Sequence, residues 1–535
     1  MKSQRILILL SVFFVLVGLS STPGTLCAQT FTGPELLSRP TASSVTLQVV
    51  INAAREIIVE YGTTSGSLSG STGVYTTTAN EPMNVLVSGL VANTKYYYRL
   101  GHRAVGDTTW TYRTERSFRT QRTQGSEFSF TVTSDGHVNI LLGGDSQWQT
   151  TLTNVATDVA SGLSDFHIDL GDSVAMDNGN TTNGSVTSAS AARTVYLYAR
   201  NANRFGRISH SAPLFLLPGN HEQTEGWHLD DNGDPANSLP TWSINARKRY
   251  FPGPVPDGFY SGNTETYAYI DGDQRLENYY AWNWGDALFV VLDPFWYTTR
   301  KAKNDPSTYG GGEDSEAGSG DRWDWTLGDA QYNWLKTTLE SSNAKYKFVF
   351  MHHLTGGTDD YIREGAYAAP YCEWGGNNED GTTYAFTTRR PTWTDPIHQV
   401  LVDNKVSAIF HGHDHQYAYE IRDGVVYHSV PAAGFTGSGF NLYSESDPLT
   451  NRVLPSSGHL RVTVAPAQTT VNYVRSGGGT TTHSYTIAPA SVTTCQGDFD
   501  VDGVVDGKDV SLLAANTGLL DIAMFAQNFG KTVCP

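Results

Sequence analysis

The most constraining feature of this sequence is a set of five apolar, strand-like runs that each end in side chains able to bind metal ions. The runs are FSFTVTSDGH (128–137), DFHIDLGD (165–172), APLFLLPGNHE (212–222), KYKFVFMHH (345–353) and VSAIFHGHDH (406–415). In an open α/β sheet, the carboxyl ends of neighbouring strands meet at one edge, so residues far apart in sequence converge there. We therefore expect one polar site built from all five runs, an arrangement typical of an enzyme.

The length and the charge of the chain limit its architecture and its partners. Its 535 residues exceed what one hydrophobic core usually organises, so two or three domains are expected. The formal net charge is -17, from 36 Lys and Arg against 53 Asp and Glu. Nucleic acids and anionic membranes bind to basic patches, and this balance argues against both partners.

Residues 1–28 have the features of a secretory signal peptide. Lys2 and Arg5 precede an apolar run over residues 6–19, and small or turn-forming residues follow. The mature chain is therefore expected to be secreted, to the periplasm or the cell exterior, although Cys27 also allows a lipid anchor. No later stretch is long and apolar enough to predict a transmembrane helix.

The remaining cysteines fit such an oxidising compartment. Cys495 and Cys534 bracket the C-terminal segment and can form a disulfide there. Cys372 is then left without a partner, and we expect an inert thiol rather than a nucleophile.

Residues 29–122 are expected to form a small β-sandwich. Short runs such as SVTLQVVI and REIIVEYG alternate β-branched or aromatic residues with polar ones, and Gly, Ser, Thr and Asn turns separate them. The stretch with Leu90, Ala92, Thr94 and Tyr96 resembles the corner of fibronectin type III domains, with Ala92 at the usual proline position. A spacer role is expected for this domain rather than substrate binding.

Residues 126–487 change to apolar strands that alternate with helices, which predicts an α/β layered domain. Trp148, Leu152 and Val155 share one face of the helix expected between the first two motif runs. Long irregular segments follow the third and fourth runs, and such loops around a rigid site commonly form the rim that meets the substrate.

The ends of the five runs carry a ligand set for two metal ions. Asp172 is the natural bridge, because a carboxylate can span both ions. Its expected partners are Asp135, His137 and His415 at the first ion, and Asn220, His352 and His413 at the second. Mixed nitrogen and oxygen ligands without thiolate fit manganese, iron or zinc. Two such ions neutralise phosphate oxygens and activate water, so the expected reaction is phosphate-ester hydrolysis by a metal-activated hydroxide.

The spacing within the first and last runs suggests how two ligands of one run reach the same place. Asp135 and His137 are two residues apart, as are His413 and His415. In extended backbone each pair is expected to point the same way. The glycine inside each pair is expected to let the chain bend close to the metal.

The blocks SDGH, LGD, GNHE, MHH and GHDH resemble the signature blocks of calcineurin-like metallophosphoesterases over residues 126–487. The resemblance implies a four-layer αββα sandwich, the same seven ligands, and His221 as an outer-shell proton donor. It also implies a small phosphate-ester substrate, with phosphomonoesters favoured. A phosphodiesterase or nucleotidase is the alternative, because these enzymes share the ligands. A surface adhesion or scaffold protein with a vestigial metal site is a more distant one.

The chain differs from purple acid phosphatases, which also carry a β-sandwich before the catalytic domain. Those enzymes have Gly two residues after the first Asp and Tyr three residues after the bridging Asp. This chain has His137 and Ala175 at these positions. An iron–tyrosinate chromophore is therefore not expected, and His137 can supply a ligand in its place.

The C-terminal segment, residues 495–535, contains the pattern of a calcium-binding EF-hand loop. Carboxylates stand at the loop's ligand positions, Gly503 permits its sharp bend, and Val504 would contribute a carbonyl oxygen. The carboxylates are Asp498, Asp500, Asp502, Asp506 and Asp509. The segment resembles a dockerin-like repeat, which implies bound Ca²⁺ and attachment to a cell surface or to another protein.

Overall fold

The computed structural model describes residues 31–137, 145–176, 186–300, 321–354, 363–490, 506–510 and 529. The expected signal peptide, Cys495, Cys534 and most of the expected calcium loop (Asp498, Asp500, Asp502, Val504) lie outside the described residues. Of that loop, Asp506 and Asp509 are described in a short helical turn, where the backbone N–H of Asp506 donates to Asp509 Oδ2 at 2.8 Å.

The N-terminal part consists of two β-sheets that face each other across one apolar core. The first sheet has the order β1-β2-β6, with β1 (Leu36–Ser38), β2 (Ser44–Val50) and β6 (Pro82–Ser88). The second has the order β4-β3-β7-β8, and β5 and β9 also pair with it. Its strands are β3 (Arg55–Gly62), β4 (Gly70–Ser71), β5 (Tyr75–Thr76), β7 (Lys95–Ala104), β8 (Thr111–Tyr112) and β9 (Arg116–Arg119).

The corner expected before β7 is present in this part. Leu90 and Tyr96 are buried in the core, and the Tyr96 hydroxyl accepts a hydrogen bond from the backbone N–H of Val91 at 3.0 Å. The aromatic residue thereby fixes the turn by which the chain crosses from one sheet to the other.

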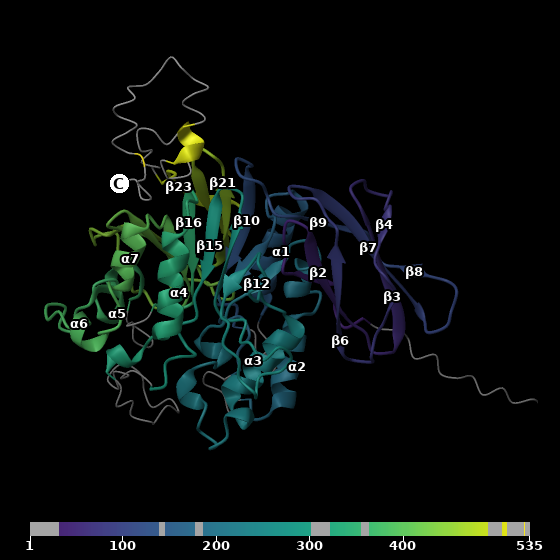
Figure 1. Ribbon diagram of the computed structural model, residues 1–535, viewed down its shortest axis with the longest axis horizontal. Coiled ribbons are helices and arrows are strands. Elements are labelled where there is room, and N and C mark those ends of the chain that lie inside the picture. The colour runs from purple at the N-terminus through teal and green to yellow at the C-terminus, as the bar shows by residue number, and fades with distance from the viewer. Residues whose placement is uncertain are drawn as a thin grey trace, which may run out of the picture.

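Two larger sheets form the centre of the molecule (Figure 1). The six-stranded sheet has the order β12-β11-β10-β21-β22-β23, and its strands β10, β11 and β12 are parallel. They are β10 (Phe128–Thr133), β11 (His167–Asp169), β12 (Leu214–Leu216), β21 (Gly458–Val464), β22 (Thr469–Arg475) and β23 (Thr481–Ile487).

The eight-stranded sheet has the order β13-β14-β15-β16-β17-β19-β18-β20, with β15, β16, β17 and β19 parallel. Its strands are β13 (Ser261–Gly262), β14 (Tyr280–Trp284), β15 (Ala287–Val291), β16 (Tyr346–Phe350), β17 (Ala408–His411), β18 (Tyr417–Arg422), β19 (Val425–Ser429) and β20 (Thr450–Leu454).

Alternating side chains of each strand explain why the two sheets stack and why helices cover their outer faces. In β16, Phe348 and Phe350 enter the core between the two sheets, whereas Val349 enters the core under the helices. In β15 the same alternation sends Phe289 inward and Val290 outward. A strand that is apolar on both faces must be covered on both, so a helix layer is required outside each sheet.

The helices supply these outer layers (Figure 1). Helices α1 (Ser146–Ala160), α2 (Ala189–Ala199) and α3 (Leu239–Tyr250) pack beside the six-stranded sheet. Helices α4 (Gly328–Glu340), α5 (Cys372–Gly375), α6 (Phe386–Arg389) and α7 (Ile397–Asp403) pack beside the eight-stranded sheet. The expected α/β sandwich is confirmed, with the N-terminal β-sheets beside it.

Short 3-10 helices lie in the connections: η1 (Phe205–Arg207), η2 (Asn220–Glu222), η3 (Gly226–His228), η4 (Pro235–Asn237), η5 (Arg322–Asp324) and η6 (Gly365–Tyr367). Cys372 is buried and has no disulfide partner in the described part of the chain. Burial raises the pKa of its thiol to about 12, so the reactive thiolate is disfavoured. No helix within the described ranges has the length and apolar character needed to cross a membrane.

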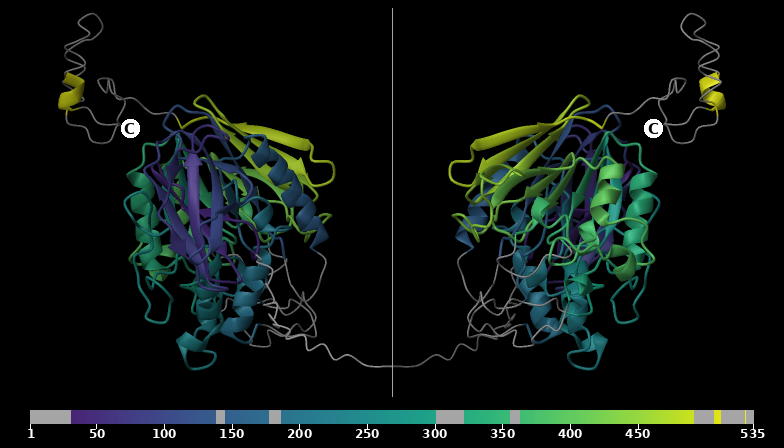
Figure 2. Two further views of the ribbon diagram at one scale, coloured as in Figure 1. Left: turned by 90° about the vertical axis from the view of Figure 1, so that its right-hand side faces the viewer. Right: turned by 90° about the vertical axis from the view of Figure 1, so that its left-hand side faces the viewer.

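The N-terminal sheets lie against the sandwich (Figure 2). Apolar packing and hydrogen bonds join the two parts. Leu36 and Val50 belong to the same core cluster as helices α1 and α2. The Arg39 guanidinium pairs with Glu277 at 2.9 Å, and the Tyr98 hydroxyl donates to the carbonyl of His210 at 2.7 Å. The two parts therefore pack as one body.

Candidate metal centre

The seven residues expected as metal ligands meet at the carboxyl ends of the parallel strands. Two follow β10, one follows β11, one lies in η2 directly after β12, one follows β16, and two follow β17. In the same order they are Asp135, His137, Asp172, Asn220, His352, His413 and His415. The expected convergence is therefore present in the structure.

The first group contains Asp135, His137, Asp172 and His415, and one potential ligand atom of each lies within 4.8 Å of the others. His415 Nε2 is 3.2 Å from Asp135 Oδ1 and 2.9 Å from His137 Nε2. His137 Nε2 is 3.8 Å from Asp172 Oδ2. These are the four residues that the sequence assigned to the first ion.

The second group contains Asp172, His352 and His413, again within 4.8 Å. The carboxamide Oδ1 of Asn220 lies 3.2 Å from His352 Nε2 and 3.1 Å from His413 Nδ1, so Asn220 faces the same space. Asp172 Oδ2 is 3.0 Å from His352 Nε2. Asp172 is thus the member shared by both groups, as a bridging ligand must be.

The charge balance of the two groups fits a pair of cations. Asp135 and Asp172 are 0 % and 1 % exposed, and within the described residues only histidines lie within ion-pair distance of their carboxylates. Buried carboxylates are otherwise paired with Lys or Arg, or bind metals. Nitrogen and oxygen donors without sulfur suit a transition metal such as manganese, iron or zinc.

The orientation of the His352 ring is fixed by a backbone carbonyl that belongs to neither group of ligands. Its Nδ1 lies 3.2 Å from the carbonyl oxygen of Leu170, which leaves Nε2 to face Asp172 and Asn220. Burial lowers the pKa of this imidazole, but the Asp172 carboxylate outweighs it and raises the pKa to about 9. A ring nitrogen held by a backbone carbonyl is the usual support of a metal-binding histidine.

The backbone at these residues corrects one expectation. Extended backbone was expected around the paired ligands, but φ is positive at each of them and at Asp172. The values are 56° at Asp135, 46° at His137, 53° at Asp172, 72° at His413 and 56° at His415. A left-handed conformation is uncommon for residues with a side chain, and such strain concentrates at functional sites.

The glycines inside the pairs also act differently from the expectation. They are needed for space rather than for a bend, because a Cβ on Gly412 would lie 2.1 Å from Ser134 Oγ. A Cβ on Gly136 would lie 2.8 Å from Trp148 Nε1. Missing side chains therefore let the two ligand-bearing loops pack against their surroundings.

His221, the expected proton donor, borders the groups. Its backbone N–H donates to Asp172 Oδ1 at 2.8 Å, and its Nε2 lies 3.9 Å from Asp172 Oδ2. Its ring makes an edge contact with His137, with 4.6 Å between ring centroids. The side chain is 25 % exposed, so it reaches the solvent-facing side of the site.

Glu222 is an important residue that the sequence reasoning left without a role. Its buried carboxylate accepts four backbone hydrogen bonds, at 2.8 Å from Asp172, 3.1 Å from Ser173, 2.7 Å from Val174 and 2.6 Å from Gly219. Burial and the neighbouring Asp172 carboxylate raise the pKa of Glu222 to about 8, and these N–H groups oppose the rise. Its place in the GNHE block was the available signal.

Two phenyl rings at the site were not predicted from the sequence. Phe435 and Phe440 both stack on the imidazole of His415, at centroid distances of 5.3 and 4.7 Å. Phe435 is 45 % exposed and also contacts the edge of His137. Their segment, GFTGSGFN, has no strand or helix pattern that would have placed it over the site.

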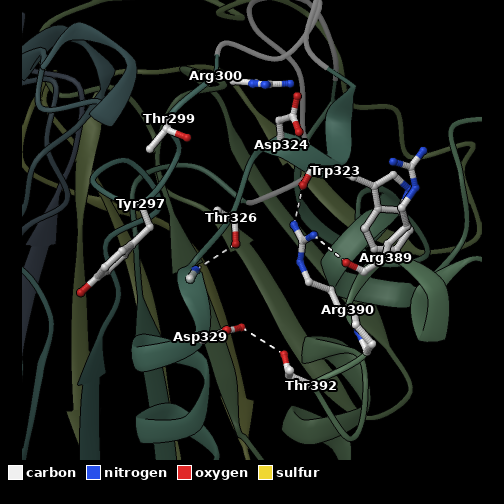
Figure 3. Close-up of a pocket in the computed structure, with 12 residues that line it drawn as sticks. Tyr297, Thr299, Arg300, Trp323, Asp324, Thr326, Asp329, Arg389, Arg390 and Thr392 are labelled. Carbon is white, nitrogen blue, oxygen red and sulfur yellow. Dashed lines mark hydrogen bonds between the residues drawn. The ribbon is translucent and has the colours of Figure 1, made fainter. Parts of the chain in front are cut away.

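A cavity of about 460 Å³ lies elsewhere on the molecule, between the segment that follows β15 and the start of α4 (Figure 3). None of the seven converging residues lines it. Arg389 pairs with Asp321, Arg390 pairs with Glu373, and Asp329 accepts a hydrogen bond from Trp393. Most of its charged groups are thus already engaged.

Comparison with known proteins adds a family and a fold. The model of the calcineurin-like phosphoesterase family matches residues 128–417. The solved structure of PhoD has a TM-score of 0.57 and 15% identity, over 85% of this chain and 89% of that one. Purple acid phosphatase PPD1 from seeds of yellow lupin (Lupinus luteus) has a TM-score of 0.53 and 14% identity, over 85% and 74%. No curated protein matches this chain in sequence.

We predict that at pH 9, where Glu222 is ionised, Glu222→Gln destabilises the metal-free protein by about 1–3 kcal/mol, because an amide nitrogen would face N–H groups that now donate to a carboxylate. Thermal unfolding and metal content measure this effect and its consequence, a metal affinity lower by roughly 10–100-fold. Glu340→Gln, on the exposed end of α4, is the matched control. Unchanged stability and metal content in Glu222→Gln would contradict the role assigned to Glu222.

A second prediction concerns colour. Ala175 stands where purple acid phosphatases have a tyrosine, and His137 lies in the first group. The iron-loaded protein is therefore expected to lack a tyrosinate charge-transfer band in its visible absorption spectrum. A strong purple colour in the purified protein would refute this expectation.

Proposed function

This chain belongs to the calcineurin-like phosphoesterase family, and from that premise we propose that it is a secreted phosphomonoesterase with two metal ions. The observation that carries the proposal is the sharing of Asp172 between the two groups of potential ligands. Two ions bridged by one carboxylate are the arrangement by which metal hydrolases act on a phosphate ester.

The proposed ligands are those that converge in the structure. Asp135, His137 and His415 would hold one ion, Asn220, His352 and His413 the other, and Asp172 both. When bound, such ions neutralise the phosphate oxygens and make a water nucleophilic near neutral pH. Manganese, iron and zinc are the proposed metals, because the donor set is nitrogen and oxygen.

The protein's own contribution to leaving-group departure is proposed for His221. Its backbone is held by Asp172, while its imidazole is partly exposed beside the site. A protonated imidazole there can donate its proton to the departing ester oxygen, which would otherwise leave as an alkoxide. The role matters most when that oxygen is strongly basic.

For the segments before and after the catalytic domain we propose the assignments made from the sequence. The paired sheets and the hydrogen bond from Val91 to Tyr96 support a fibronectin III-like domain in residues 29–122. Signal-peptide cleavage after residue 28 and a dockerin-like Ca²⁺ repeat in residues 495–535 rest on the sequence alone. The alternative of a scaffold with a vestigial metal site is opposed by the complete convergence of seven donors.

Asp172→Ala should abolish both metal loading and turnover, because one substitution removes a ligand from each ion. Metal analysis and an assay with 4-nitrophenyl phosphate measure the two effects. Asp107→Ala, in an exposed turn of the N-terminal sheets, should leave both unchanged. Full activity in Asp172→Ala would show that the site has been assigned wrongly.

His221→Ala should slow alkyl phosphate esters more than 4-nitrophenyl phosphate, since nitrophenolate leaves without a proton. A general acid contributes roughly 10²–10⁴-fold, so the loss of kcat on alkyl esters should fall in this range. His228→Ala, seven residues further along and paired with Asp231, is the control. Equal losses on both ester types would argue against the acid role.

A further inference from the structure

A second cavity, of about 400 Å³, lies between the N-terminal sheets and the catalytic sandwich. Strands β7 and β9 form one wall, and the end of α1 with the segments around residues 162–165 and 207–211 forms the other. Figure 1 places β9 beside α1. A cavity of this size at a domain interface is large enough for a small molecule.

The charged groups of this cavity are mostly basic, in a chain whose net charge is -17. Lys95, Arg116, Arg119 and Arg207 line it, against Glu115 and Asp165. Lys95 and Arg119 are direct partners in the antiparallel pairing of β7 with β9. Like charges at directly opposed positions destabilise a sheet unless something compensates them.

The two acidic residues are already engaged. Asp165 receives two hydrogen bonds from Arg122, at 2.6 and 3.0 Å, and one from Trp284 Nε1 at 3.3 Å. Glu115 accepts from the Ser65 hydroxyl at 2.6 Å and from the Gly66 N–H at 3.0 Å. These two engaged carboxylates therefore do not neutralise all four basic side chains of the cavity.

The basic residues keep donors to spare. Across the described residues, no carboxylate lies within 4.0 Å of Lys95 or of Arg116, and Arg119 reaches only Asp165, at 3.7 Å. Arg207 donates to the neutral side chains of Thr153 and Asn203. The pKa of His210, which also lines the cavity, is lowered to about 4, mainly by burial and further by the charge of Arg116.

The cavity is separate from the metal centre. Residues 162–165 lead into the amino end of β11, whereas Asp172 follows its carboxyl end. Seven residues of roughly extended chain span about 20 Å. A molecule in this cavity is therefore distinct from the ester bound at the metals.

We propose that this interdomain cavity binds a small molecule through a phosphate or sulfate group, held by Lys95 and Arg119, which are directly opposed on the same face of β7 and β9. Guanidinium and ammonium groups form charge-assisted hydrogen bonds with tetrahedral oxyanions, and the bound anion relieves the repulsion between Lys95 and Arg119. The ligand joins the N-terminal sheets to the catalytic sandwich, because both contribute walls.

The test uses the full-length protein carrying Asp172→Asn, which disables phosphate binding at the metals. Calorimetric titrations at low salt with inorganic phosphate, inorganic sulfate and glucose 6-phosphate should show one site whose affinity falls as NaCl is added. The tightest of the three probes identifies the source of the oxyanion. Absence of binding for all three overturns the proposal.

Variants locate the site. Adding Lys95→Gln and Arg119→Gln should weaken the binding at least about tenfold, and Lys95→Arg should retain it. Arg193→Gln, which removes an exposed charge from α2, should have no effect. Equal affinity in the Lys95→Gln/Arg119→Gln protein and the Arg193→Gln protein would overturn the assignment. Circular dichroism and a melting curve establish that each variant is folded.

Discussion

The arrangement of the metal centre depends on the buried carboxylate of Glu222. It gathers N–H groups from Gly219 and from three consecutive residues beginning at Asp172, so it ties the loop after β12 to the loop after β11. Asp172 lies at the start of that loop and belongs to both groups of potential ligands. This tie helps to hold the left-handed backbone at Asp172, together with the hydrogen bond from the His221 N–H to its carboxylate.

The two stacked sheets make that tie useful, because they bring ligands from both halves of the sandwich to one edge. Asp135, His137, Asp172 and Asn220 come from three loops of the six-stranded sheet, and the other three ligands come from two loops of the eight-stranded sheet. The aromatic core between the sheets, with Phe130 in contact with Phe289, Phe348 and Phe350, sets their separation. Interiors of this kind are close-packed, so the distance between the ligands of the two sheets is fixed.

The sequence predicted much of this because the relevant signals are local. Apolar runs that end in Asp, Asn or His predicted both the strands and the gathering of their ends. Asn220 was placed correctly as well, although a carboxamide is a common residue in loops. What the sequence missed depends on distant contacts. Gly136 and Gly412 pack against Trp148 and Ser134, and Phe435 of an irregular loop stacks on His415.

The N-terminal sheets illustrate the same limit at the level of domains. The sequence predicted their strands and the corner at Tyr96. No pattern within residues 29–122 predicts how these sheets pack against the sandwich. Leu36 and Val50 complete the core beneath α1 and α2, so removal of these sheets would expose apolar surface of the catalytic part. A domain that shares a core with its neighbour cannot move as a loosely tethered spacer. The attachment is therefore rigid, and the cavity it encloses has walls of fixed geometry.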